Sequence, residues 1–186
     1  NAFMDYTPTV LKNKGISCQF CKTQKSDSSP TGWSRIFDDK EELVTETVLV
    51  RFNNNSISDI EEFWGGLETW QDALEKKPYN TMRQTLSFVL GRELHDVGEA
   101  MIDGDIVAYS NVIGSAWSIA NGVDPIVAGQ MLTQAFRLAE ENKKTLQKNL
   151  EEMMPTLELQ ETASDSGNSG SVSGPKRASR SKNSGN

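Results

Sequence analysis

The chain has 186 residues and a formal net charge of −7, with 36% hydrophobic and 24% charged residues. That length is enough for one domain with a real core, and the composition is ordinary for a soluble globular protein. The negative charge argues against a nucleic-acid-binding body, because phosphate contacts need clustered Lys and Arg. The charge is uneven, however, since an acidic body is followed by a short basic end that holds Lys176, Arg177, Arg180 and Lys182.

The sequence carries no signal for a membrane or for secretion. No apolar run approaches the roughly 20 residues that a membrane-spanning helix needs. The opening stretch NAFMDYTPTVLKNKG also lacks the apolar block of a secretory signal. We therefore expect a cytoplasmic protein with no membrane partner.

Residues 1–32 are rich in Lys, Ser, Thr and Pro, which predicts an irregular N-terminal segment. Within it, the motif CQFC holds Cys18 and Cys21. Such a pair is half of a zinc site, a redox dithiol or two incidental reduced cysteines. Zinc takes four ligands, so a complete site would need His95 with a carboxylate, or a second chain. We favour incidental cysteines and expect no metal or cofactor, while the two other interpretations stay open.

Residues 33–155 are expected to form a helical domain that opens with short strands. The stretches GWSRIF and ELVTETVLVRF carry the β-branched and aromatic residues typical of strands. NNNS then makes a turn, and Ser56 or Ser58 is placed to cap a helix. Two short helices follow, ISDIEEFWGG and LETWQDALEKK, separated by Gly65 and Gly66.

The next helices are bounded by the same kinds of residue. Pro78 is expected to end LETWQDALEKK, and Asn80 or Thr81 to cap NTMRQTLSFVLGREL. HDVGEAMIDGD predicts a short helix that stops at Gly104.

The motif NGVDP predicts a tight corner between two longer helices, residues 108–121 and residues 125–154. Gly122 can adopt the left-handed conformation that closes a helix. Asp124 is a good N-cap, and Pro125 suits the first helical position because no amide hydrogen is needed there. We expect these three residues to be structural.

After Pro155 the composition changes, and the end of the chain has no aromatic residue. Such a segment buries too little apolar surface to offset its ordering entropy, so residues 156–186 are expected to be a disordered Ser/Gly/basic tail. The predicted fold class is mostly α: a small helical domain with a short N-terminal β element and a disordered C-terminal tail.

The distal half of the last helix carries a narrow apolar stripe on a charged background. Leu146, Leu150 and Met153 recur at spacings of four and three, so they lie on one helical face. A helix over residues 125–154 would be about 45 Å long, longer than a small domain is wide. We interpret the stripe as a partner-binding face, for an apolar helix or for a second copy of the chain. The alternative is that it packs on the chain's own core.

The residues favour no catalytic scheme. With His95 as the single histidine, any Ser–His–Asp or Cys–His arrangement would have to use it. Neighbouring carboxylates such as Glu61 and Glu62 point to different sides of a helix, and no phosphate-binding glycine loop is present. We expect that the protein is not an enzyme.

Two stretches, FNNNSISDIEEFWGGLETWQDALEKKPYNTMRQTLSFVLG and AMIDGDIVAYSNVIGSAWSIANGVDP, resemble tail assembly chaperones of long-tailed (siphovirus-type) phages, especially those of actinobacteria. The matching features are a strand leading into short helices, the pattern P-x-x-T-x-R-x-T-L at Pro78 to Leu86, and the corner A-x-S-x-A-N-G-V-D-P. The resemblance covers roughly residues 45–140, and residues 1–32 lie outside it.

The resemblance implies a small, mostly helical protein that holds the apolar tape measure protein soluble in the host cytoplasm until tail-tube subunits polymerise around it. The tape measure protein is the expected partner, with the tail tube protein as a second candidate and a homo-oligomer as a further option. Two other functions remain open: a nucleic-acid-binding or regulatory adaptor that uses the basic tail and a partial zinc site, and a metal or thiol enzyme centred on Cys18, Cys21 and His95.

Overall fold

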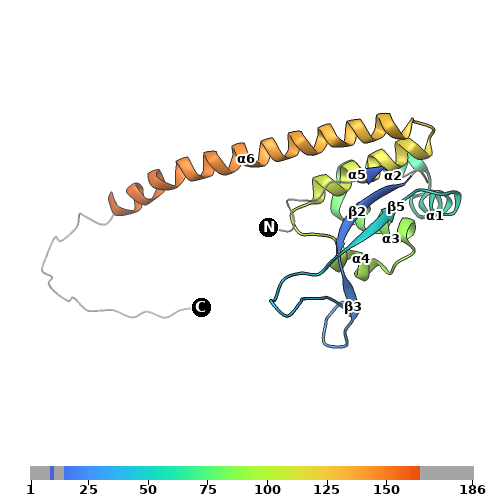
Figure 1. The fold of residues 1–186 in the computed structure, drawn as a ribbon, viewed down its shortest axis with the longest axis horizontal. Coiled ribbons are helices and arrows are strands. Elements are labelled where there is room, and N and C mark those ends of the chain that lie inside the picture. Colours follow the sequence, from blue (N-terminus) through green and yellow to red (C-terminus); the bar gives the residue numbers. More distant parts are fainter. Residues whose placement is uncertain (1–8, 11–14, 164–186) are drawn as a thin grey trace, which may run out of the picture. The chain divides into compact units, whose positions relative to one another are not determined.

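The structure is a computed structural model that describes residues 9–10 and 15–163. It consists of two compact units, Asn1–Asn142 and Lys143–Asn186, which we describe one at a time. As the sequence predicts, the fold is mostly helical with small N-terminal sheets (Figure 1). None of the described helices is both long enough and apolar enough to span a membrane.

A small antiparallel sheet forms one side of the first unit. Its strands are β1 (Thr9–Val10), β2 (Ile16–Cys21) and β5 (Thr45–Val50), in the order β1-β2-β5. In β2, Ile16, Cys18 and Phe20 alternate with less buried residues, as in a strand with one face on the core. Two further strands, β3 (Thr23–Lys25) and β4 (Trp33–Arg35), pair with each other in a second sheet.

The strands expected in GWSRIF and ELVTETVLVRF are confirmed as β4 and β5. The irregular segment expected for residues 1–32 is wrong where it covers β1, β2 and β3. Only three buried residues alternate in β2, and Lys, Thr and Ser surround the strand in the sequence. The local composition therefore gave no clear strand signal. Because β2 pairs with β5 along its whole length, residues 16–21 belong to the same core as the helices.

The helices of the first unit are α1 (Asn54–Trp64), α2 (Leu67–Lys76), α3 (Pro78–Leu90), α4 (Leu94–Ala100) and α5 (Ile106–Ala120). Several of their ends differ from the sequence expectation. The N-cap of α1 is Asn53, which exchanges hydrogen bonds with Ser56 in a capping box, so Ser56 lies inside the helix. Pro78 begins α3, so the predicted caps Asn80 and Thr81 lie inside that helix instead. Helix α4 ends at Ala100, before Gly104.

The core of the first unit lies between the sheet and the helices. Phe20 of β2 meets Tyr109 of α5 with ring centroids 5.0 Å apart. Trp70 of α2 meets Trp117 of α5 at 5.0 Å, and Phe52 contacts both tryptophans. The buried hydrophobic residues run from Ile16 to Leu132, so strands and helices distant in sequence share one cluster.

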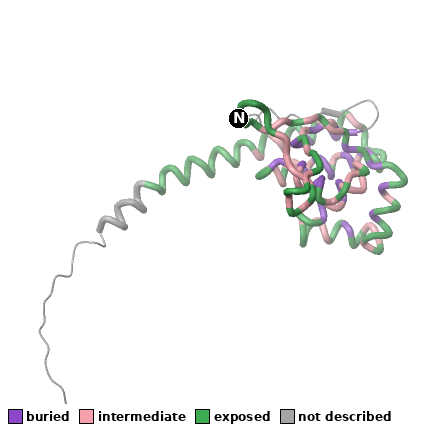
Figure 2. Tube along the Cα trace, turned by 90° about the horizontal axis from the view of Figure 1, so that it is seen from below, coloured by how far each residue is buried: buried purple, intermediate pink, exposed green. Residues whose placement is uncertain are grey.

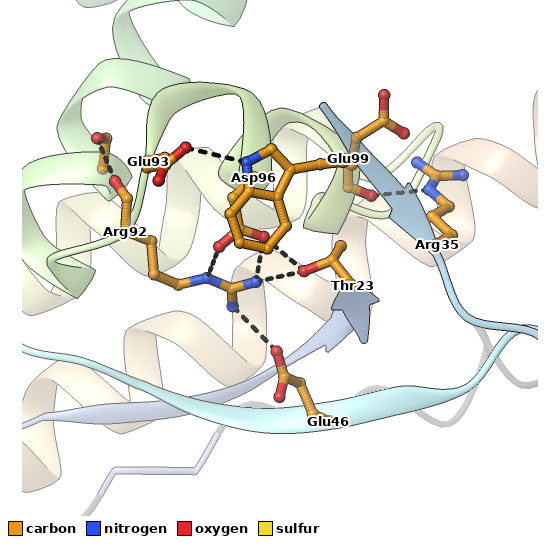
Figure 3. Close-up of polar contacts among 9 residues, drawn as sticks. Thr23, Arg35, Glu46, Arg92, Glu93, Asp96 and Glu99 are labelled. Atoms are coloured by element: carbon orange, nitrogen blue, oxygen red, sulfur yellow. Dashed lines mark hydrogen bonds and ion pairs between the residues drawn. The ribbon is translucent and has the colours of Figure 1, made fainter. Parts of the chain in front are cut away.

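A polar network ties the strands to the turn between α3 and α4 (Figure 3). Arg92 donates to both carboxylate oxygens of Asp96, at 2.8 and 2.7 Å, and to Glu46 of β5 at 3.0 Å. The hydroxyl of Thr23 in β3 accepts from Arg92 and donates to Asp96. Burial works against ionisation of Asp96, but the bonds from Arg92 and Thr23 outweigh it and lower the pKa of that carboxyl.

Helix α6 (Pro125–Ala163) is a 39-residue helix that begins in the first unit and ends in the second. Its first turns belong to the first unit, where Ala128 and Leu132 are buried. The helix continues past the expected end near residue 154, because TLELQETA consists largely of good helix formers. The predicted disordered tail is therefore wrong for residues 156–163, and its remainder, residues 164–186, lies outside the described residues.

Candidate functional site

The corner between α5 and α6 has the geometry of two opposed helix caps. Gly122 has φ of 93°, and its amide donates to Ile119 O while the amide of Val123 donates to Ser118 O. These two bonds make a Schellman motif. Asp124 Oδ1 then accepts the amide of Ile126 at 2.8 Å, and Pro125 is the first residue of α6. Positive φ at Gly122 and the Asp124 cap are the features that the sequence predicts.

In the second unit, the described side chains of α6 all lie at the surface. Every residue from 143 to 154 is exposed, and Figure 2 colours this stretch accordingly. Leu146 is 61% exposed, Leu150 55% and Met153 59%. Within their own unit these side chains form an exposed apolar face, and partner binding stays a prediction.

The exposed apolar residues are aligned along the helix. We call Leu146, Leu150 and Met153 the distal stripe; Met154, 64% exposed, lies beside it. Scattered apolar residues are normal on protein surfaces, but an aligned group is typical of an interaction surface. Burying one such side chain fully stabilises a complex by roughly 1.5–3 kcal/mol. The remaining positions include Lys143, Lys144 and the pair Glu151–Glu152, which keep the helix soluble.

A second apolar stripe lies on the part of α6 that belongs to the first unit. Val127, Met131 and Leu138 are 46%, 63% and 60% exposed. Their spacings of four and seven residues put them on one helical face. We call them the proximal stripe. The sequence did not single out this stripe; Ala128 and Leu132 pack on the core, and the neighbouring face does not.

The two cysteines are structural in this fold. Cys18 and Cys21 are both buried free thiols inside strand β2. Residues three apart in a strand point to opposite faces of the sheet and lie about 10 Å apart along it, so the pair cannot hold one ion or close a disulfide. Burial raises the pKa of Cys21, with Arg35 opposing and Asp103 and Glu99 adding to the rise. A raised pKa keeps the thiol in its unreactive protonated form.

His95 lies exposed on α4, away from any set of metal ligands within residues 15–154. In the described part of the chain, no group of three or more His, Cys, Asp and Glu side chains is placed to hold a metal. The zinc arrangement weighed from the sequence, with Cys18, Cys21 and His95 around one ion, therefore does not form in this fold.

Comparisons with protein-family models, with curated proteins and with solved structures find no match to this chain. The functional interpretation therefore rests on the sequence resemblance and on the chemistry of the surfaces themselves. Of those surfaces, the distal stripe is the one that both the sequence and the exposed side chains single out.

Proposed function

We propose that this chain is a phage tail assembly chaperone that binds apolar helical segments of the tape measure protein and keeps them soluble in the host cytoplasm during tail assembly. The observation that carries the proposal is the distal stripe: three large apolar side chains on one face of a helix, each more than half exposed. The tail tube protein is a second candidate partner. The role is one of binding, and the proposal includes no catalytic step.

The chemistry of the stripe supports a helical apolar client. A long helix that presents apolar residues at spacings of four and three offers grooves that match the ridges of another amphipathic helix. Met153 and Met154 add flexible side chains that adapt to partners of different shape, which suits a chaperone of a long client. The proximal stripe extends the apolar surface available on α6.

The adaptor alternative has less support. Its zinc-tied N-terminus conflicts with the opposed directions of Cys18 and Cys21, and its basic tail lies outside the described residues. The exposed surface of α1 and α2 carries Asp59, Glu61, Glu62, Glu68, Asp72 and Glu75, which would repel nucleic acid.

The test uses the full chain with Leu146→Gln and Leu150→Gln together. Gln nearly preserves helix propensity while removing the apolar surface. The control is Lys144→Gln with Lys148→Gln, which has the same spacing on the opposite face of the same helix. When each protein is co-expressed with an apolar helical fragment of the tape measure protein, the Leu double variant should lose most of the soluble fragment. The Lys double variant should keep it.

The outcomes separate the possible occupants of the stripe. A Leu double variant that folds normally and still keeps the fragment soluble would contradict the proposal that the distal stripe binds the client. If the parent is an oligomer and the Leu variant a monomer by sedimentation, with protection unchanged, then the stripe is a self-association seam. Adding Met131→Gln and Leu138→Gln tests whether the proximal stripe shares the client.

A further inference from the structure

A pocket of about 510 Å³ opens in the first unit between the start of α3, helix α4 and the loop after it. This volume is in the range of sites that bind small molecules or single side chains. Tyr79, Asn80 and Arg83 of α3 form one wall, and His95 and Gly98 of α4 form another. No residue of either α6 stripe lines the pocket, and the proposed chaperone role does not use it. Arg83 is the arginine of the Pro78 to Leu86 pattern.

Arg83 contributes the guanidinium that lines the pocket. Its Nη2 donates to Asn80 Oδ1 at 3.3 Å, while its Nε is buried and meets no acceptor among the described residues. Buried N–H groups almost always have a partner, so this one calls for an explanation. The other two arginines of this region, Arg35 and Arg92, each pair with a carboxylate. No ion pair joins Arg83 to another described residue.

Gly98 makes room for Arg83. A Cβ at position 98 would lie 3.1 Å from Arg83 Cδ and 3.6 Å from Nη1, so the arginine stem crosses the helix where a side chain is missing. Glycine inside a helix is unfavourable relative to alanine. The fold therefore keeps a less favourable residue in α4 at the point that seats Arg83 against the pocket.

Two acids, Glu99 and Asp103, also line the pocket. Asp103 receives two hydrogen bonds from Arg35, at 2.8 and 3.0 Å, and Glu99 accepts from the hydroxyl of Thr31 at 3.3 Å. The Thr31 hydroxyl is neutral, so Glu99 keeps its charge, and the side-chain donors at the pocket belong to Arg83, Asn80 and His95. One guanidinium balances one negative charge and matches a carboxylate in shape, whereas a phosphate carries about two charges. The lining also includes Met101, Ile102 and Ile106, which contribute apolar surface.

We propose that this pocket binds a carboxylate carried on an apolar body, with Arg83 as its anchor. The carboxylate has two possible sources with the same chemistry: the C-terminus or an acidic side chain beside an apolar one in a partner protein, or a free organic acid. The apolar lining receives the body, and the guanidinium receives the charge. The Asn80 amide and the His95 imidazole are further donors at the same pocket.

The test titrates the full chain with N-acetyl-leucine, hexanoate and N-acetyl-leucinamide, following the Arg83 side-chain N–H and nearby amides by NMR. Both acids should shift these signals with millimolar affinity, as expected for one anchor on a small ligand. The neutral amide, with the same apolar body, should not. Tighter binding of N-acetyl-leucine than of hexanoate assigns the site to a peptide end, and equal binding assigns it to free acids.

Variants locate the anchor. Arg83→Gln should abolish the shifts caused by the acids, and Arg83→Lys should weaken binding by about tenfold because the two-pronged contact is lost. Arg137→Gln removes an exposed arginine elsewhere in the first unit and should bind like the parent. Thermal melting of each variant establishes that it folds. Equal shifts with the amide, unchanged binding by Arg83→Gln, or no shift with either acid would each overturn the proposal.

Discussion

Trp70 is 1% exposed, and its indole N–H still has a partner. Nε1 donates to Thr85 Oγ1 at 2.9 Å, and the same hydroxyl donates to Thr81 O at 2.7 Å. A single threonine on α3 therefore satisfies a tryptophan on α2 and a backbone carbonyl of its own helix. Because all three groups are buried, none of them has water as a substitute partner.

Thr85→Val should lower the free energy of unfolding by about 1–3 kcal/mol, because it leaves the Trp70 N–H buried without an acceptor at nearly constant volume. Urea denaturation measures the change. The control is the same substitution in a Trp70→Phe variant, which has no indole N–H. In that variant, Thr85→Val should lower the free energy of unfolding by clearly less. Equal costs in both backgrounds would show that this hydrogen bond contributes little.

A second prediction at this scale concerns Gly122 and Asp124, at the corner between α5 and α6. Asp124→Ala should lower the free energy of unfolding by about 1 kcal/mol, because the amide of Ile126 loses its acceptor. Gly122→Val should cost more than Asp124→Ala, because a β-branched residue resists the positive φ of 93°. Thermal melting tests both, and a pair of variants that melt like the parent would contradict the cap geometry.

At the scale of elements, Arg92 and Arg35 hold the β3–β4 sheet to α4. Arg92 reaches Thr23 of β3, and Arg35 of β4 donates to Glu99 O at 2.7 Å and to Met101 O at 2.9 Å. Trp33 adds a bond from its indole N–H to Glu93 Oε2 at 3.1 Å. These strands are too short to be stable alone, so their position depends on side-chain contacts with a helix that lies far away in the sequence.

The network predicts an acid-sensitive stability. Arg92 and Thr23 hold the pKa of Asp96 below its usual range despite burial, and Arg35 lowers that of Asp103. A carboxyl whose pKa is lower in the folded state than in the unfolded state stabilises the fold when it is ionised. This contribution is complete at pH values above the unfolded-state pKa of about 3.9, and it is lost as the pH falls through the folded-state pKa. The free energy of unfolding should therefore decrease as pH falls below about 4.

Asp96→Asn is the control for that prediction. It cannot ionise, so its unfolding free energy should be lower than that of the parent at neutral pH and should depend less on pH in the acid range. Denaturation curves recorded at several pH values measure both effects. An Asp96→Asn profile parallel to that of the parent would assign the acid sensitivity to other carboxyls.

At the scale of the whole molecule, the buried hydrophobic residues of the described chain all lie between Ile16 and Leu132. The second unit, which starts at Lys143, has only exposed side chains over residues 143–154. Stability and the distal stripe are thus located in different parts of the chain. The distal stripe is therefore open to substitution without loss of the core.

A chain that ends at Asn142 should melt at the same temperature as the full chain, within error, because it keeps every residue of the buried cluster. It should also fail to protect a tape measure fragment if the distal stripe binds the client. Calorimetry and the co-expression assay measure the two effects separately. A clear drop in melting temperature would show that residues beyond 142 stabilise the first unit.

Much of the helical fold could be predicted from the sequence because its signals are local. Gly65, Gly122, Asp124 and Pro125 act within a few residues of where they stand, through backbone conformation and cap bonds. The distal stripe was also visible, since helical spacing alone puts Leu146, Leu150 and Met153 on one face. Local signals failed where a residue suits two roles, as at Pro78, which the sequence placed at the end of a helix and which begins α3 instead.

Only the tertiary structure decided which residues meet across long separations. Strand β2 is recognisable by its pairing with β5, some 28 residues away at Gln19 and Thr47, and that pairing makes CQFC part of a sheet. The seating of Arg83 over Gly98 likewise depends on the packing of α3 against α4. The physical reason is that caps and helical periodicity act through neighbours along the chain. Burial and strand pairing depend instead on surfaces that come together only when the whole chain folds.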